Sequence, residues 1–128
     1  MNRGARVGDV LGRGSAREGV HQWWQLRTTS AALAVLGVWF VVAVLTLPDL
    51  GWSSVTTWIA RPVNAVLLLL FVTVSTWHSA LGLQVVVEDY VRGKGARVLV
   101  LVLLRFAHVL AGAAAVFAVL KLAIEGRA

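Results

Sequence analysis

The chain has 128 residues, of which 59% are hydrophobic and only 14% are charged. Soluble domains average about 25% charged and 45–50% apolar residues, and a domain of this size leaves much of its surface in water. This composition excludes an ordinary soluble enzyme, and it excludes a disordered chain because disorder requires low hydrophobicity. Three bilayer crossings of about 20 residues each would use nearly half of the chain. A small polytopic membrane protein is the class that remains.

The charge is strongly basic, with 12 Lys and Arg residues against 6 acids and a net charge of +6. Such a balance sometimes indicates nucleic-acid binding, which places the cations in one patch interleaved with aromatic residues. Here most cations flank long apolar runs instead. This pattern is typical of charges that direct membrane insertion, so we expect a lipid bilayer and no nucleic acid as partner. The chain has no cysteine, which excludes zinc–thiolate sites and cysteine-ligated iron–sulfur clusters from it.

The first 30 residues are polar and rich in glycine, a composition that predicts a loosely ordered arm. Within this arm, residues 19–24 include paired tryptophans, which favour the headgroup zone of a membrane and indicate an interfacial segment. A first uncharged apolar span follows at 31–47 and is closed by Pro48-Asp49. Residues 28–30 are expected to extend this span, because 17 residues are short for a crossing.

Two further apolar runs follow, at 63–87 and 98–120. The first of them starts after Arg61-Pro62, and proline suits the first turn of a helix because its missing N–H has no partner there. The second contains the single charge found within the three spans, Arg105, so 17 of the 18 charged residues lie outside them. We therefore predict an all-α membrane protein with a three-helix anchor over 31–122 and a short tail over 123–128.

The orientation follows from the cations on either side of the membrane. An odd number of spans places the N-terminal arm and the loop between the second and third spans on the same side, with eight basic residues against three on the other. The eight are Arg3, Arg6, Arg13, Arg17, Arg27, Arg92, Lys94 and Arg97, and the three are Arg61, Lys121 and Arg127. Because cytoplasmic loops carry the excess of Lys and Arg, we expect a cytoplasmic N-terminus.

Polar residues inside a span are functional candidates, and His78 lies deep in the second span. Gly82 is four residues on, on the same helical face, where the missing side chain leaves room. Asp89 is 11 residues on, about 16 Å along that face. A large flat group bound at His78 would then lie below an acidic interfacial site. A hydrogen bond to a neighbouring helix would equally account for a neutral imidazole, so both interpretations stay open.

The second span ends at Glu88-Asp89-Tyr90, and Tyr90 is the only tyrosine in the chain. An aromatic residue at this position is typical of a membrane interface, but a phenol there is also a good hydrogen-bond donor to a quinone carbonyl. In the third span, Arg105 and His108 are three residues apart and share a face. Arg105 is expected to extend toward the cytoplasmic headgroups, whereas His108 is the main rival of His78 as a metal ligand.

These residues form a pattern that resembles a known family. The order His78-x3-Gly82-x6-Asp89-Tyr90 is similar to the signature of the small hydrophobic membrane anchor of succinate dehydrogenase (respiratory complex II), a cytochrome b-type anchor. The resemblance extends to residues 19–21 and 26–28 before the first span and to the three-span layout, so it covers nearly the whole chain.

The resemblance implies half of a haem-binding helical bundle, which a second membrane anchor with three spans of its own would complete. A b-type haem would take one axial histidine from each anchor, and His78 matches the ligand of this one. Arg27, His21 and Gly82 match positions in the haem neighbourhood, with Arg27 near the propionates and His21 at the cytoplasmic entrance. The pair of anchors would dock the iron–sulfur and flavoprotein subunits on the cytoplasmic face.

Electrons would then pass from succinate to ubiquinone or menaquinone, with Tyr90 and Asp89 matching quinone-site positions. The resemblance implies no catalysis by this chain alone, since it lacks cluster cysteines and a Gly-rich dinucleotide fingerprint. Two alternatives stay open at this point. One is the anchor of a fumarate reductase, and the other is a non-redox membrane scaffold in which helix packing alone satisfies His78.

Overall fold

The computed structural model describes the backbone of residues 13–126 and the side chains of residues 19–126. The described chain is helical and has no strand. It consists of α2 (Arg13–Leu45), α3 (Trp52–Ala60), α4 (Pro62–Tyr90) and α5 (Lys94–Glu125). Three of these helices include segments long and apolar enough to cross a membrane, namely Gly19–Leu45, Pro62–Tyr90 and Lys94–Glu125. The prediction of an all-α fold with three membrane-spanning helices is therefore confirmed.

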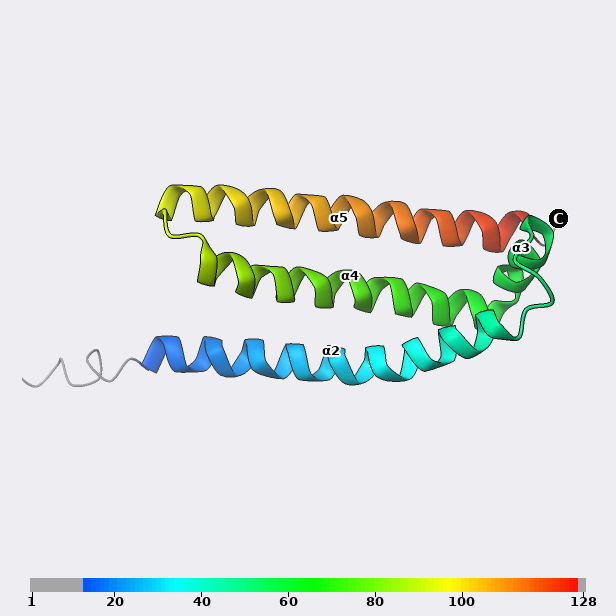
Figure 1. The fold of residues 1–128 in the computed structure, drawn as a ribbon, viewed down its shortest axis with the longest axis horizontal. Coiled ribbons are helices and arrows are strands. Elements are labelled where there is room, and N and C mark those ends of the chain that lie inside the picture. The colour runs from blue at the N-terminus through cyan, green and yellow to red at the C-terminus, as the bar shows by residue number, and fades with distance from the viewer. Residues whose placement is uncertain (1–12, 127–128) are drawn as a thin grey trace, which may run out of the picture.

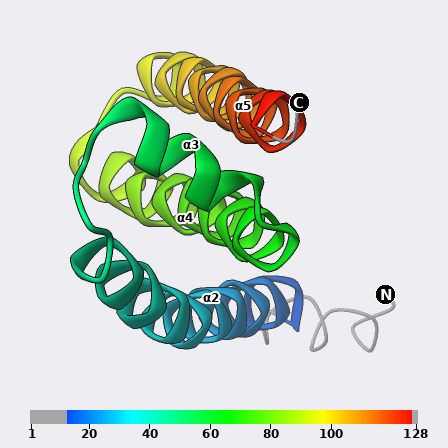
Figure 2. The ribbon, with the colours of Figure 1, turned by 90° about the vertical axis from the view of Figure 1, so that its right-hand side faces the viewer.

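The three long helices lie side by side in one layer, with α4 between α2 and α5 (Figures 1 and 2). Each runs antiparallel to the next one in the chain, because short connections join helices that are neighbours in space. The beginning of α2 and the turn between α4 and α5 therefore share one end of the molecule, while α3 and the end of α5 occupy the other (Figure 1). We call these the turn end and the α3 end. The expected cytoplasmic side corresponds to the turn end.

The helix boundaries differ from the predicted spans in two places. Helix α2 begins at Arg13, so residues 13–30, whose composition predicted a loosely ordered arm, continue the first span as helix. Glycines at 14 and 19 lower helix propensity by about 1 kcal/mol each, but neither prevents the helix from extending beyond the bilayer core. The predicted interfacial segment 19–24 is thus part of α2. The cations Arg3, Arg6 and Arg127 lie outside the described residues.

The second difference is α3, a nine-residue helix in the stretch expected to connect the first two spans. It begins after Gly51, whose N–H donates to the Asp49 carboxylate at 2.7 Å, and it ends at Arg61. Pro62 then opens α4 at a position where its missing N–H costs no hydrogen bond. This short helix was not predicted because nine residues are too few to cross a bilayer and too few to show a clear period.

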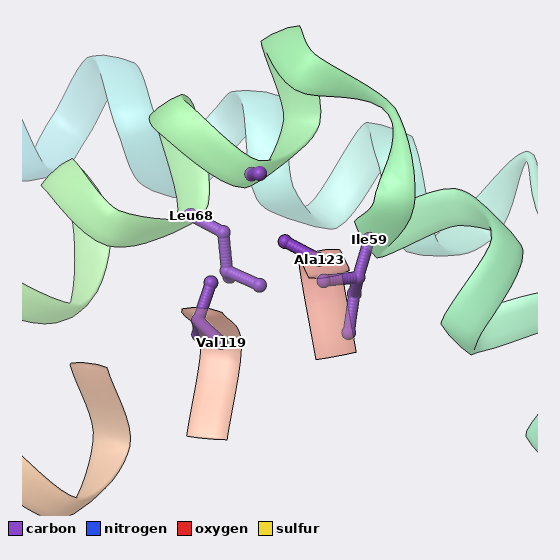
Figure 3. Packing of buried hydrophobic residues seen from close by; sticks show 5 residues of the cluster. Ile59, Leu68, Val119 and Ala123 are labelled. Carbon is purple, nitrogen blue, oxygen red and sulfur yellow. The ribbon is translucent and has the colours of Figure 1, made fainter. Parts of the chain in front are cut away.

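The buried core lies at the α3 end, where α3 packs onto α4 and α5. Figure 3 shows this cluster of Ile59, Leu68, Val119 and Ala123, which Ala65 completes. The contact is close, since a Cβ at Gly126 would lie only 2.9 Å from Cβ of Ala60. Helix α3 therefore closes the end of the bundle and holds α4 and α5 together there.

Aromatic rings attach α2 to the same end. Trp39 of α2 stacks on Trp58 of α3 with ring centroids 5.8 Å apart, and Phe40 of α2 stacks on Phe71 of α4 at 5.1 Å. Offset aromatic pairs of this kind contribute about 0.5–1.5 kcal/mol beyond their buried area. The buried cluster and the aromatic pairs that join α2 to α3 and α4 thus connect the helices toward the α3 end of the fold.

Most of the apolar surface of the long helices is not covered by the chain itself. In the most apolar 18-residue stretches of α2 and α5 no residue is buried. A single chain in water would not keep such a surface exposed. A lipid bilayer is an environment in which such a surface stays exposed to apolar surroundings, and the chain is a multi-pass membrane protein.

Candidate functional site

His78 of α4 faces α2 and makes a hydrogen bond with Thr29 of that helix. Nδ1 of His78 lies 2.9 Å from the hydroxyl oxygen of Thr29. The Thr29 hydroxyl donates its own hydrogen to the carbonyl oxygen of Gln25 at 2.7 Å, with a second carbonyl, that of Leu26, at 3.1 Å. With its hydrogen committed, the Thr29 oxygen accepts, and Nδ1 of His78 is the donor. Nε2 of the neutral ring then carries the lone pair, and it makes no hydrogen bond to any described residue.

Thr29 belongs to a polar stripe on α2 that repeats every four residues. His21, Gln25 and Thr29 lie on neighbouring turns, with Nε2 of His21 3.0 Å from Nε2 of Gln25. Gln25 is bonded to both of the others, since its backbone carbonyl oxygen accepts a hydrogen bond from the Thr29 hydroxyl. Spacing of four residues keeps side chains on one helical face. This stripe, which begins at His21 and ends against His78, lies in the half of α2 nearer the turn end.

Gly82 leaves space beside His78 on α4. A Cβ built at Gly82 would meet no atom of the described chain within 4 Å. One helical turn separates the two residues, so this space lies next to the imidazole on the same face. The role of this space in binding a large flat group stays a prediction.

His108, the rival ligand candidate, has a different environment. Its Nδ1 lies 2.8 Å from the carbonyl oxygen of Leu104, which only accepts, so Nδ1 carries the proton. Its Nε2 lies 3.2 Å from the hydroxyl of Ser79 on α4, which then donates to it. Both ring nitrogens of His108 are therefore occupied by groups of this chain. A metal ion could bind His108 only by displacing one of these hydrogen bonds.

Arg105 and His108 line a separate cavity of about 550 Å³ between α4 and α5. Its other polar lining comes from Thr73, Thr76, Trp77 and Gln84, and the remainder is apolar. Thr29 is not part of this lining. His78 and His108 thus belong to different surroundings, which sequence spacing alone could not distinguish.

Arg27 and His21, the other positions expected near a haem, lie on α2, two and eight residues before the Thr29 that contacts His78. The guanidinium carbon of Arg27 is 5.7 Å from the ring centroid of Trp23, and both side chains are exposed. This cation–π contact holds the cation against an aromatic face near the turn end. Arg27 is two residues from Thr29, so it points away from the face that meets α4.

The end of α4 presents acidic and phenolic groups at the turn end. Glu88 accepts a hydrogen bond from the amide nitrogen of Gln84 at 2.8 Å. Asp89 and Tyr90 follow as the last two residues of the helix, and both are exposed. Tyr90 is 81% exposed, and its hydroxyl has no hydrogen-bond partner among the described residues. The phenol is available to a molecule or protein outside this chain.

The turn between α4 and α5 is basic. Nε of Arg97 donates to the carbonyl oxygen of Val91 at 3.0 Å, which ties the first turn of α5 to the end of α4. Arg92 and Lys94 in the same turn are exposed. Tyr90 and Asp89 therefore lie beside a cationic surface at the end where α2 also begins (Figure 1).

Within residues 19–126, no three His, Asp or Glu side chains form a group suited to a metal ion. What the α2–α4 face offers is a single imidazole with a free Nε2, fixed through Nδ1 and next to an open space at Gly82. This donor set fits the planar group of a haem, whose iron takes axial imidazoles. The second ligand of a bis-histidine haem would have to come from another chain.

The fold and the site together define a class of protein, an all-helical multi-pass membrane protein with exposed acidic, phenolic and basic side chains at the turn end of its bundle. The model of the succinate dehydrogenase/fumarate reductase transmembrane subunit family matches residues 1–120. The chain therefore belongs to this family, and the resemblance noted from the His78 motif is confirmed.

Relatives with the name succinate dehydrogenase hydrophobic membrane anchor subunit are similar over most of the chain. The protein of Rickettsia conorii is 35% identical over 88 residues, which cover 68% of this chain and 70% of the relative. That of Rickettsia bellii is 32% identical over 87 residues, or 68% and 70% of the two chains. That of Paracoccus denitrificans is 32% identical over 82 residues, or 64% of each. No solved structure matches the chain.

Sequence reasoning missed Thr29 and Ser79, the two hydroxyls that hold the histidines. The signal for Thr29 was weak, since residues 21, 25 and 29 form one polar stripe but Gln22, Arg27, Thr28 and Ser30 around it are polar as well. Ser79 had no such signal, because its pairing with His108 depends on the register between α4 and α5. The predicted roles of Arg27, His21, Asp89 and Tyr90 stay predictions.

Proposed function

We propose that this chain is the haem- and quinone-binding membrane anchor of a succinate:quinone oxidoreductase. It pairs with a second membrane anchor and holds the flavoprotein and iron–sulfur subunits against the cytoplasmic face of a bacterial inner membrane. Its membership of the succinate dehydrogenase/fumarate reductase family supports the anchor role. The free Nε2 of His78 beside the open space at Gly82 is the observation that carries the haem assignment.

In this proposal Nε2 of His78 and a histidine of the partner anchor would hold the iron of a b-type haem. Thr29 keeps the proton on Nδ1, so Nε2 presents its lone pair without any change of tautomer. Gly82 makes room for the macrocycle on the same face. The bound haem supplies a one-electron carrier inside the membrane. Arg27, in the half of α2 nearer the turn end, provides a positive charge near the haem propionates. His21, on the same part of α2, lies at the cytoplasmic entrance to the haem site.

The quinone binds at the turn end in the same proposal. Reduction of a quinone to a quinol takes up two electrons and two protons, and succinate releases the same numbers when it becomes fumarate. The Tyr90 hydroxyl, which has no partner in this chain, donates a hydrogen bond to a quinone carbonyl oxygen. The exposed carboxylate of Asp89 and the adjacent water provide the route for protons.

The family includes fumarate reductase subunits as well, so the reverse direction is the second candidate. The same residues serve either direction, because the site that protonates a quinone also deprotonates a quinol. The relatives from Rickettsia and Paracoccus carry the succinate dehydrogenase name, which favours succinate oxidation. Comparing the succinate:quinone and quinol:fumarate rates of the purified complex decides between the two directions.

The haem assignment is tested by His78→Ala in the purified complex. We expect the b-type signal in reduced-minus-oxidised optical spectra to be lost or greatly weakened, while the chain still inserts, because insertion depends on apolar length. His108→Ala is the matched control, since it removes a second intramembrane imidazole. An unchanged bis-histidine signal in His78→Ala would remove His78 as the ligand. Absence of haem from the wild-type complex would favour a non-redox scaffold.

A further inference from the structure

Thr29 has a hydrogen-bonding arrangement that differs from those of the other threonines in the described helices. Four others donate their hydroxyls to a carbonyl four residues earlier in the chain and make no hydrogen bond to a second helix. These are Thr46, Thr56, Thr73 and Thr76. Thr29 makes the same back-bond to Gln25 and, in addition, contacts the imidazole of His78 on α4. Its oxygen thereby joins two helices through residues that are 49 positions apart in the chain.

The back-bond determines the direction of the contact with His78. A hydroxyl has one hydrogen, and that of Thr29 is donated along α2 to the Gln25 carbonyl at 2.7 Å. The oxygen is left to accept, which fixes the proton of the neutral imidazole on Nδ1. An imidazole held in this way keeps one tautomer and one ring orientation. Both properties matter for a ligand that binds a metal through the opposite nitrogen.

We propose that Thr29 is a positioning residue for the haem ligand, holding His78 through Nδ1 so that Nε2 faces the haem iron. This inference rests on the proposed function, because it requires haem at His78. Thr29 does not touch the iron, and it acts through the imidazole. A hydrogen bond from Nδ1–H makes the ring a stronger electron donor, which stabilises the oxidised iron and lowers the haem potential.

The experiment replaces Thr29 in the complete purified complex. Thr29→Val keeps the shape of the side chain and removes the hydroxyl, whereas Thr29→Ser keeps the hydroxyl and removes the methyl group. Thr28→Val is the matched control, because Thr28 is the exposed neighbour and does not contact His78. The measurements are the haem midpoint potential by optical redox titration, the low-spin haem signal by electron paramagnetic resonance, and the haem-to-flavin ratio.

We expect Thr29→Val to raise the midpoint potential, alter the low-spin signal and lower haem affinity by roughly tenfold, at the low end of the effect of residues that hold a metal's ligands in place. Thr29→Ser and Thr28→Val should match the wild type. If Thr29→Val retains no haem, Thr29→Ser decides. A wild-type haem content in Thr29→Ser supports the role of the hydroxyl. If Thr29→Ser loses as much haem as Thr29→Val, the positioning role is overturned and Thr29 acts through the packing of its methyl group.

The two proposals fail in different ways. A wild-type potential and signal in Thr29→Val, with haem lost from His78→Ala, would overturn the positioning role and leave the haem ligand intact. Haem unchanged in His78→Ala would instead overturn the proposed ligand. Each result is read from the haem itself, so a change in quinone turnover is not needed to interpret it.

Discussion

Ser79 and His108 join α4 to α5 through a hydrogen bond of 3.2 Å between the serine hydroxyl and Nε2 of the imidazole. The adjacent residue on α4, His78, is rotated by about 100° around the helix and bonds instead to Thr29 of α2. Ser79 and His78, neighbours on α4, thus connect this helix to α5 and α2. Both ring nitrogens of His108 are used in hydrogen bonds within the chain, whereas Nε2 of His78 has no partner among the described residues.

Replacement of His108 is therefore expected to affect packing and leave the haem in place. His108→Ala removes the contact with Ser79, and a hydrogen bond of this kind is worth about 0.5–1.5 kcal/mol. We expect an unchanged reduced-minus-oxidised spectrum and a slightly lower thermal stability of the complex. Ser79→Ala should give the same small loss of stability, because it removes the same bond from the other side. Loss of the haem signal in His108→Ala would contradict this division of roles.

Helices α4 and α5 approach each other closely at Gly112. A Cβ there would lie 3.1 Å from Cγ2 of Thr76, whereas a Cβ at Gly37 would meet no atom within 4 Å. Alanine stabilises a helix interior by about 0.5–1 kcal/mol relative to glycine, but overpacking costs about 1–3 kcal/mol. We expect Gly112→Ala to be less stable than Gly37→Ala by about 1–3 kcal/mol, measured by unfolding of the chain in detergent micelles.

A double variant tests the cause of that loss. Thr76→Ser removes the methyl group that the new Cβ would meet. Combined with Gly112→Ala it should recover most of the lost stability, and the two changes should be non-additive as expected for residues in contact. Additive effects would show that Gly112 matters for a reason other than its distance from Thr76.

The sequence predicts the class of fold well because apolar length is a strong signal. Three runs free of acids, with one internal cation at Arg105, correspond to α2, α4 and α5. Their ends are less predictable, since neither hydropathy nor composition indicates where a helix stops once it leaves the bilayer. Helix α2 consequently begins at Arg13, well before the predicted span.

The candidate site is predictable in its residue types and not in its contacts. His78 stands out because ionisable residues are rare in an apolar span. Gly82 and the Asp89-Tyr90 pair stand out because Gly82 and Asp89 follow His78 at helical spacing. The partner of each histidine depends instead on the register between helices. A shift by one residue would rotate α4 by about 100° and exchange the surroundings of His78 and Ser79. Sequence alone does not specify that rotation.

The topology is expected to follow the cation count. Eight basic residues on the side of the N-terminus and of the α4–α5 turn, against three on the other, predict a cytoplasmic turn end. A reporter inserted between Gly93 and Gly95 should be active on the cytoplasmic side. Reporters fused after Gly51 or at Ala128 should be active on the opposite side, because the α3 end is the end of the bundle opposite the turn between α4 and α5. A cytoplasmic C-terminus would overturn both the topology and the docking side.

Tyr90 distinguishes a quinone site from an ordinary helix end. Its hydroxyl has no partner in the described chain, and the ring is largely exposed, so Tyr90→Phe should leave the fold of this chain unchanged. If the hydroxyl donates to a quinone carbonyl, its loss removes a bond that strengthens as the oxygen gains negative charge. Hydrogen bonds to charged groups are worth about 1.5–3 kcal/mol, which corresponds to roughly 10- to 150-fold in the rate of quinone reduction.

The measurement compares two activities on one preparation of the complex. Succinate oxidation by quinone should fall by that factor in Tyr90→Phe, whereas oxidation by an artificial acceptor that takes electrons from the flavin or the clusters should be unaffected. The second activity is the internal control, because its chemistry lies in other chains of the complex. A parallel fall of both activities would mean that Tyr90 holds the complex together, and no fall in either would make it an interfacial aromatic residue with no part in the reaction.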